Sequence, residues 1–193
     1  MRTIDLKCRD SFASPVSGCR DFQQEALFLG HYGQIYLFFD LPADPGACVL
    51  QKASLILFKL PYIFSCGEND CAGYPADQYT LYPLLDFFNV FCQAFSPPTV
   101  DCSRRVCYQD FRCCSYTEID ITQIVKDWSD GKLENRGILL TGSPHSPCLY
   151  YASSRYEILW MRPLIRLTCG EIEKPGVLRA VPCEVKINAA EDP

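Results

Sequence analysis

The sequence predicts an all-β domain, a jelly-roll-like β-sandwich with one short helix. Two observations indicate this fold. Short runs of aromatic and aliphatic residues, separated by turn residues, recur along the chain, and only one stretch shows helical periodicity. The chain has 193 residues, of which 48% are hydrophobic and 13% aromatic. This composition is sufficient for one domain with a single large core.

The first half of the chain predicts three strands. Residues 25–30 and 34–40 are rich in aromatic and aliphatic side chains, and the turn residues 31–33 between them indicate a hairpin. Residues 41–46 include two prolines and a glycine and therefore predict a loop. Residues 53–60 place apolar side chains on both faces, which predicts a strand that is covered on both sides.

The second half predicts four more strands, separated by an irregular excursion. The strands are expected at residues 78–84, 136–141, 149–152 and 163–168. Residues 86–115 hold five of the 13 cysteines and show no clear periodicity, so we expect them to leave the sandwich.

One helix is expected between the strands. Its apolar face is formed by residues at i, i+3, i+4 and i+7, namely Ile121, Ile124, Val125 and Trp128. Asp120 or Thr122 is suited to cap its first turn, and Gly131 is suited to the left-handed conformation that ends a helix. A lone short helix in a β protein is expected to close one open end of the sandwich.

The sequence divides into three parts. Residues 1–8 predict an N-terminal arm, and residues 9–169 predict the sandwich domain. Residues 170–193 begin with a linker and continue with alternating apolar residues that resemble a strand. This tail is expected to pair with an edge of its own domain or with an edge of another subunit.

Cysteine is the most unusual feature of the composition, with 13 residues. Small secreted domains use many disulfides because their hydrophobic cores are insufficient, whereas the core expected here is large. The odd number leaves at least one thiol for another molecule, although individual thiols also serve as small buried apolar side chains. The candidates for disulfides between subunits lie in or near the termini: Cys8, Cys19, Cys169 and Cys183. The candidates for disulfides within the chain lie closer together: Cys66, Cys71, Cys102, Cys107, Cys113 and Cys114.

The order of several motifs resembles the DNRLRE domain of bacterial and archaeal surface proteins, over residues 9–168. The matching segments are Asp10–Phe12, Tyr36–Leu41, Ala53–Leu57, Ile119–Trp128, Asn135–Leu140 and Arg162–Leu167. The resemblance implies a jelly-roll module, similar to carbohydrate-binding modules, that acts on cell surfaces and generally has no catalytic residues.

Signals for catalysis and for cofactor or metal binding are weak. The only histidines, His31 and His145, lie in expected turns, and no nucleophile elbow accompanies them. There is no C-x2-C pair for zinc and no glycine-rich phosphate loop, so we predict a non-enzymatic protein without a cofactor or metal. A net charge of −5 disfavours nucleic acid as a partner, and no apolar run reaches the roughly 20 residues of a membrane span.

Two functions fit these observations. The favoured hypothesis is a self-assembling structural subunit of an extracellular or spore-surface fibre or appendage, cross-linked to its own copies by disulfides. The alternative is a module that binds carbohydrate or cell-wall polymer by aromatic stacking, although most such aromatics belong to a core. Its candidate residues are Tyr32, Tyr74, Tyr150, Tyr151 and Trp160. Residues 1–12 show no features of a secretory signal, so a surface location implies either that a signal has already been removed and a Met added or that the protein leaves its cell by another route.

Overall fold

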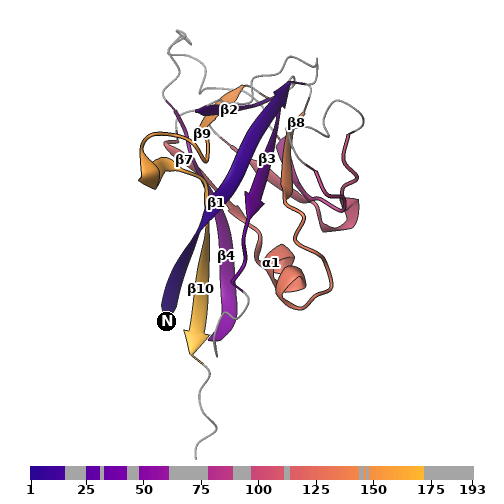
Figure 1. Cartoon of the computed structure of the whole chain (residues 1–193), viewed down its shortest axis with the longest axis vertical. Helices are drawn as coiled ribbons and strands as arrows, with labels where there is room; N and C mark the ends of the chain where they lie inside the picture. Colours follow the sequence, from indigo (N-terminus) through magenta and orange to yellow (C-terminus); the bar gives the residue numbers. More distant parts are fainter. Residues whose placement is uncertain are drawn as a thin grey trace, which may run out of the picture.

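The computed structural model is mostly β-strand, with one α-helix, as the sequence predicts (Figure 1). It describes residues 1–15, 25–30, 33–42, 48–60, 78–88, 97–110, 114–143, 146 and 148–171. The strands are β1 Arg2–Pro15, β2 Ala26–Leu29, β3 Gly33–Phe39, β4 Cys48–Phe58, β5 Gln78–Pro83, β6 Val106–Gln109, β7 Tyr116–Asp120, β8 Ile138–Gly142, β9 Leu149–Ala152 and β10 Leu164–Glu171.

Eight strands form one antiparallel sheet in the order β6-β5-β8-β3-β1-β10-β4-β7, and β2 pairs with β9 in a second sheet. The large sheet folds over at β1. Residues Arg2–Lys7 of β1 pair with β10, whereas Cys8–Pro15 pair with β3, and the register shifts between Cys8 and Asp10. Such a shift bends a strand and lets it turn from one layer of a sandwich into the other.

The first half of β1 corrects the expected N-terminal arm. Residues 2–8 are part of the sheet, because Ile4 and Leu6 alternate toward the main core and pack against it. Exposed charged residues alternate with Ile4 and Leu6, so the sequence of this segment resembles that of a solvent-exposed arm.

The small sheet links the two layers of the large sheet, which together form a nearly closed barrel. Gly30 and Gly33 exchange two backbone hydrogen bonds of 3.2 and 3.3 Å, which link the end of β2 to the start of β3. The two strands belong to different sheets, so the expected hairpin is limited to this one bridge. On the other side of the small sheet, Tyr151 of β9 forms a β-bridge with Lys59, just after β4. The expected turn residues 31 and 32 lie outside the described residues.

Seven expected strands correspond to β2, β3, β4, β5, β8, β9 and β10. The excursion expected over residues 86–115 is only partly irregular, because it contains a 3-10 helix, η2 (Cys102–Arg104), and the strand β6. The strand β7 follows it and was also missed. The sheet continues to Glu171, two residues beyond the expected domain end, and residues 172–193 with their expected tail strand lie outside the described residues.

The helix α1 (Thr122–Ser129) lies beside β4 (Figure 1). The Asp120 carboxylate accepts hydrogen bonds from the Thr122 amide at 2.9 Å and from the Thr122 hydroxyl at 2.6 Å. Gly131, with φ of 70°, ends the helix as expected. Its apolar face is buried at Ile124, Val125 and Trp128, and so the helix covers the main core.

Two apolar clusters pack against the large sheet. The main core lies between the two halves of the folded sheet and includes Leu37, Leu55 and Ile165. A second, aromatic cluster surrounds Phe12 and Tyr36, whose rings stack at 4.8 Å. The layer that contains β3 and the second half of β1 is therefore packed on both faces.

Candidate functional site

Four of the described cysteines have exposed, free thiols: Cys102, Cys107, Cys114 and Cys148. Cys102 begins η2, Cys107 lies in β6, and Cys114 comes two residues before β7. Since β6 and β7 are the two end strands of the large sheet, three of these thiols lie at or beside its edges.

The exposure of Cys107 follows from strand geometry. Successive side chains of a strand point to opposite faces. In β6, Val106 and Tyr108 are half-buried, whereas Cys107 and Gln109 are exposed. Cys107 is opposite Thr80 of β5, so backbone pairing fixes its place on the outer face.

Charged contacts anchor the neighbouring 3-10 helix. The Arg104 guanidinium donates to the Asp101 carboxylate at 2.6 Å and to the Asp127 carboxylate of α1 at 2.5 Å. Hydrogen bonds from Ser103 and then Arg104 lower the pKa of Asp101 to about 2. These contacts tie the segment that carries Cys102 to the helix.

The two described terminal candidates are in the core. Cys8 is 7% exposed and Cys169 is 2% exposed, and both belong to the main apolar cluster. Burial raises the pKa of the Cys8 thiol to about 12, which removes the thiolate needed for disulfide exchange near neutral pH. The structure therefore corrects the expectation that these two thiols reach another subunit, and Cys19 and Cys183 lie outside the described residues.

The candidates for disulfides within the chain stay a prediction. The three described ones, Cys102, Cys107 and Cys114, are exposed free thiols on separate segments at the sheet edges. The other three candidates, Cys66, Cys71 and Cys113, lie outside the described residues. Sequence reasoning did not single out Cys148, which is exposed next to β9.

The candidate sugar-stacking aromatics are dispersed. Tyr151 is fully buried, and Tyr150 is half-buried against Phe28, with ring centroids 6.1 Å apart. Trp160 is 67% exposed and meets Phe58 edge-on at 5.8 Å. Burial therefore removes Tyr151 as a stacking residue and leaves Trp160 as the most exposed described candidate. Tyr32 and Tyr74 lie outside the described residues.

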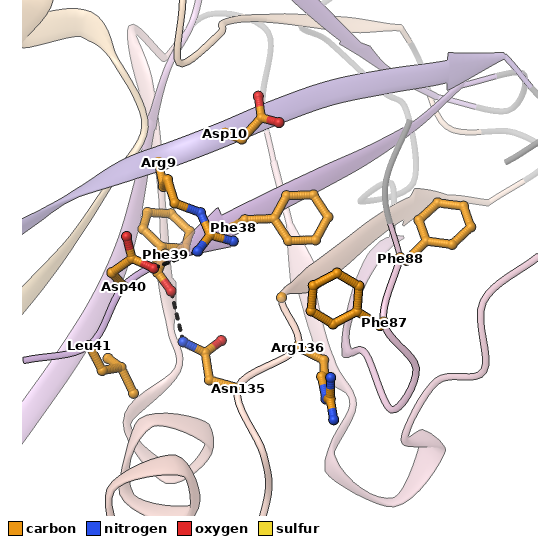
Figure 2. A pocket seen from close by; sticks show the side chains of 11 residues that line it. Arg9, Asp10, Phe38, Phe39, Asp40, Leu41, Phe87, Phe88, Asn135 and Arg136 are labelled. Atoms are coloured by element: carbon orange, nitrogen blue, oxygen red, sulfur yellow. Dashed lines mark hydrogen bonds and ion pairs between the residues drawn. The ribbon is translucent and has the colours of Figure 1, made fainter. Parts of the chain in front are cut away.

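A cleft of about 360 Å³ opens where β3 ends (Figure 2). Arg9 and Asp40 line one side and form an ion pair of 2.8 Å. On another side, the Asn135 amide donates a hydrogen bond of 2.8 Å to the Phe39 carbonyl and fixes the chain that follows α1.

Phe87 is the exposed aromatic residue of this cleft. Its ring is 73% exposed, and the Arg136 guanidinium lies over it at 5.4 Å from the centroid. A flat aromatic ring beside carboxylate, amide and guanidinium groups resembles the chemistry that binds sugars. The sequence signal was the pair Phe87 and Phe88 within a stretch that was expected to be irregular.

A buried polar cluster lies on the side of the barrel where β6 and β7 end the sheet. The Lys59 amine is 2.5 Å from Oδ1 of Asp110, and these two side chains are only 8% and 4% exposed. Oδ2 of Asp110 accepts hydrogen bonds from the Tyr151 hydroxyl at 2.7 Å and from the Thr117 hydroxyl. Four segments of the chain therefore meet at one carboxylate.

The phenols of this cluster are protonated. Burial raises the pKa of both Tyr108 and Tyr151 well above the ordinary value, and the charge of Asp110 adds to the effect. The Tyr108 hydroxyl is buried and has no hydrogen-bond partner within the described part of the chain. Sequence reasoning missed the cluster, because its residues belong to segments that are far apart in the chain.

No protein-family model matches the chain, and a search of curated proteins found no match. Among the described residues, no group of three or more His, Cys, Asp or Glu side chains is placed to hold a metal ion. No helix in the described ranges has both the length and the apolar character needed to cross a membrane.

Proposed function

We propose that this protein is a self-assembling structural subunit of an extracellular or spore-surface fibre or appendage, cross-linked by disulfides between copies. The observation that carries the proposal is the exposure of Cys102, Cys107 and Cys114 at or beside the two end strands of the sheet. This set replaces the buried Cys8 and Cys169 as the cross-linking residues.

Edge strands supply the contact that would bring these thiols together. An end strand exposes unpaired backbone N–H and C=O groups, which favour pairing with another chain. Contact between β6 of one copy and β7 of the next joins different surfaces, and such contacts build open filaments when the rotation does not close. Disulfides persist in oxidising environments, so this role agrees with a location outside the cell.

Electrophoresis without reductant tests the proposal. We expect the oxidised wild-type protein to form a ladder of dimers and multimers that collapses when reductant is added. Cys107→Ser and Cys114→Ser should each shorten the ladder, and the double variant should run mainly as a monomer. Cys148→Ser is the matched control, because its thiol is also exposed but lies outside the large sheet. A wild-type monomer under both conditions would contradict the covalent assembly.

Carbohydrate or cell-wall polymer binding is the second candidate, and the cleft beside Phe87 favours it. An exposed ring flanked by Asp40, Asn135 and Arg136 offers both stacking and hydrogen bonds to sugar hydroxyls. The motif order that resembles DNRLRE domains supports this surface role as well as the first.

Titration of the protein with soluble cell-wall oligosaccharides tests the second candidate. We expect Phe87→Ala to weaken binding at least tenfold, whereas Trp160→Ala, which changes an equally exposed ring outside the cleft, leaves it unchanged. Binding that is lost with Trp160→Ala and kept with Phe87→Ala would contradict a site in this cleft.

A further inference from the structure

The Lys59–Asp110 pair has an arrangement that favours a covalent reaction. Lys59 follows the end of β4, and Asp110 follows the end of β6, so the two side chains come from different layers. Their N–O distance is 2.5 Å, and both are nearly excluded from solvent. The rigid strands therefore hold an amine and a carboxyl group in contact, where a reaction between them is effectively unimolecular.

Burial also favours the product of such a reaction. Two opposite charges lose their hydration when they are buried, and this cost can exceed their mutual attraction. An amide is uncharged, so its formation removes both charges from this buried site. The proton that must leave Nζ before it can attack has an acceptor in contact, because Oδ1 of Asp110 lies 2.5 Å away.

We propose that Lys59 and Asp110 join through a side-chain amide bond. The lone pair of Nζ forms a bond to Cγ of Asp110, and the bond between Cγ and Oδ1 breaks. Of the three protons on the initial ammonium group, one remains on the amide nitrogen and two leave with Oδ1 as water. No oxidant, reductant or other co-reactant is required.

The hydroxyl groups around Asp110 are placed to assist this step. Negative charge develops on Oδ2 when Nζ attacks Cγ, and Oδ2 already accepts hydrogen bonds from Tyr151 and Thr117. Donors that are fixed in position before the reaction stabilise such charge effectively in a site that excludes water. Since the Tyr151 phenol remains protonated, it is available as a donor throughout.

The cross-link would fasten the side of the barrel where β6 and β7 end the large sheet without pairing with each other. It connects residues that are 51 positions apart, just beyond β4 in one layer and β6 in the other. A cross-link across a long loop restricts the unfolded chain and raises resistance to unfolding. The inference is independent of the proposed disulfide assembly, because none of its residues is a cysteine.

The intact mass of the reduced and alkylated protein tests the proposal. We expect wild-type protein to be lighter than its sequence by one water molecule, and trypsin to leave the bond after Lys59 uncut. Fragmentation should then identify a branched peptide that joins Lys59 to Asp110. Full sequence mass in the folded, purified protein would overturn the proposal, and so would a loss of water located elsewhere, for example at Asp130–Gly131.

Two matched variants sharpen the test. Lys59→Arg retains a cation but has no amine to acylate, so it should show its full sequence mass. Asp110→Asn should still react, now with loss of ammonia, and yield a product with the same mass as processed wild type. Tyr151→Phe should slow the appearance of the lighter species during refolding. The wild-type mass decides the proposal even where a variant fails to fold.

Discussion

The two sides of this barrel are closed in different ways. On one side, β1 belongs to both layers, so backbone hydrogen bonds run without interruption from β3 through β1 to β10. On the other side, β6 and β7 end the sheet, and side chains around Asp110 connect the layers. The fold therefore depends on backbone pairing through β1 on one side. On the opposite side it depends on the polar side chains around Asp110 and on the backbone bonds that join Lys59 and Leu60 to β9.

The polar contacts beside the two sides also differ in charge. Near β1, the buried Ser11 hydroxyl exchanges hydrogen bonds with Ser154, accepting from its amide at 2.7 Å. On the open side, the buried partners are an amine and a carboxylate. Burial of a neutral hydroxyl that keeps its hydrogen-bond partners costs little free energy, whereas burial of an isolated charge costs a great deal. Substitutions should therefore have larger effects on the open side.

The largest effect is expected for Asp110→Ala. Removing one partner of a buried ion pair leaves an uncompensated charge on Lys59 and costs about 3–5 kcal/mol of unfolding free energy. Urea unfolding followed by circular dichroism measures this loss. The double variant Lys59→Met/Asp110→Leu is the control. It leaves no uncompensated charge and should be destabilised less than Asp110→Ala. A loss below about 1 kcal/mol for Asp110→Ala would mean that the open side does not depend on this carboxylate.

Ser11→Ala should have a smaller effect. The substitution leaves the buried Ser154 amide without its hydrogen-bond acceptor and should cost about 1–3 kcal/mol. The same urea titration gives the comparison, with Ser115→Ala, at an exposed serine, as the control. If Ser11→Ala destabilises the fold more than Asp110→Ala, the proposed difference between the two sides is reversed.

The exposed and the buried thiols should differ mainly in how fast they are alkylated. Cys107→Ser should change the unfolding free energy by less than about 0.5 kcal/mol, because its side chain is exposed on the edge strand. In native protein at pH 8, alkylation followed by peptide mass analysis should label Cys102, Cys107 and Cys114 quickly. Cys8 should be labelled only after unfolding, because burial holds its pKa at about 12. Equal labelling rates would contradict the assignment of buried and exposed thiols.

The smallest effect is expected from the pH dependence of the Asp101 contacts. The pKa of Asp101 is lowered to about 2 from an ordinary value of 3.8, so its carboxylate stabilises the folded state at higher pH. This contribution is fully present above about pH 5 and is lost as the pH falls through 4 toward 2. The difference in unfolding free energy between wild type and Asp101→Asn should therefore shrink over that range. A difference that grows on acidification would contradict the assignment.

Much of the fold could be predicted from local patterns. The strand β3 contains the continuous apolar run from Ile35 to Phe39, and α1 combines a helical apolar face with a terminal Gly131. The expected side-chain cap is corrected: the N-cap residue is Ile121, and Asp120 instead accepts a hydrogen bond from the Thr122 amide just before the helix. The strands β6 and β7 were missed because they are only four and five residues long and alternate exposed residues with buried ones. The cysteines around them concealed this alternation, since a cysteine fits either face.

The site was harder to predict for a physical reason. Nearness to a chain end suggested that Cys8 and Cys169 are accessible, but β1 pairs with β3 at Cys8 and with β10 at Cys169, and both thiols lie in the core. The Lys59–Asp110 contact depends on how strands that are far apart in the sequence fold over one another. No local sequence pattern predicts that arrangement, so only the three-dimensional structure could reveal it.

Electron microscopy of the purified protein tests the central claim, that the edge with exposed thiols assembles copies of this chain. Negatively stained samples of oxidised wild type and of Cys107→Ser/Cys114→Ser would be compared before and after reduction. The account predicts regular filaments or sheets for oxidised wild type and dispersed particles for the double variant. Dispersed monomers of wild type under both conditions, or filaments that are unchanged in the double variant, would contradict it.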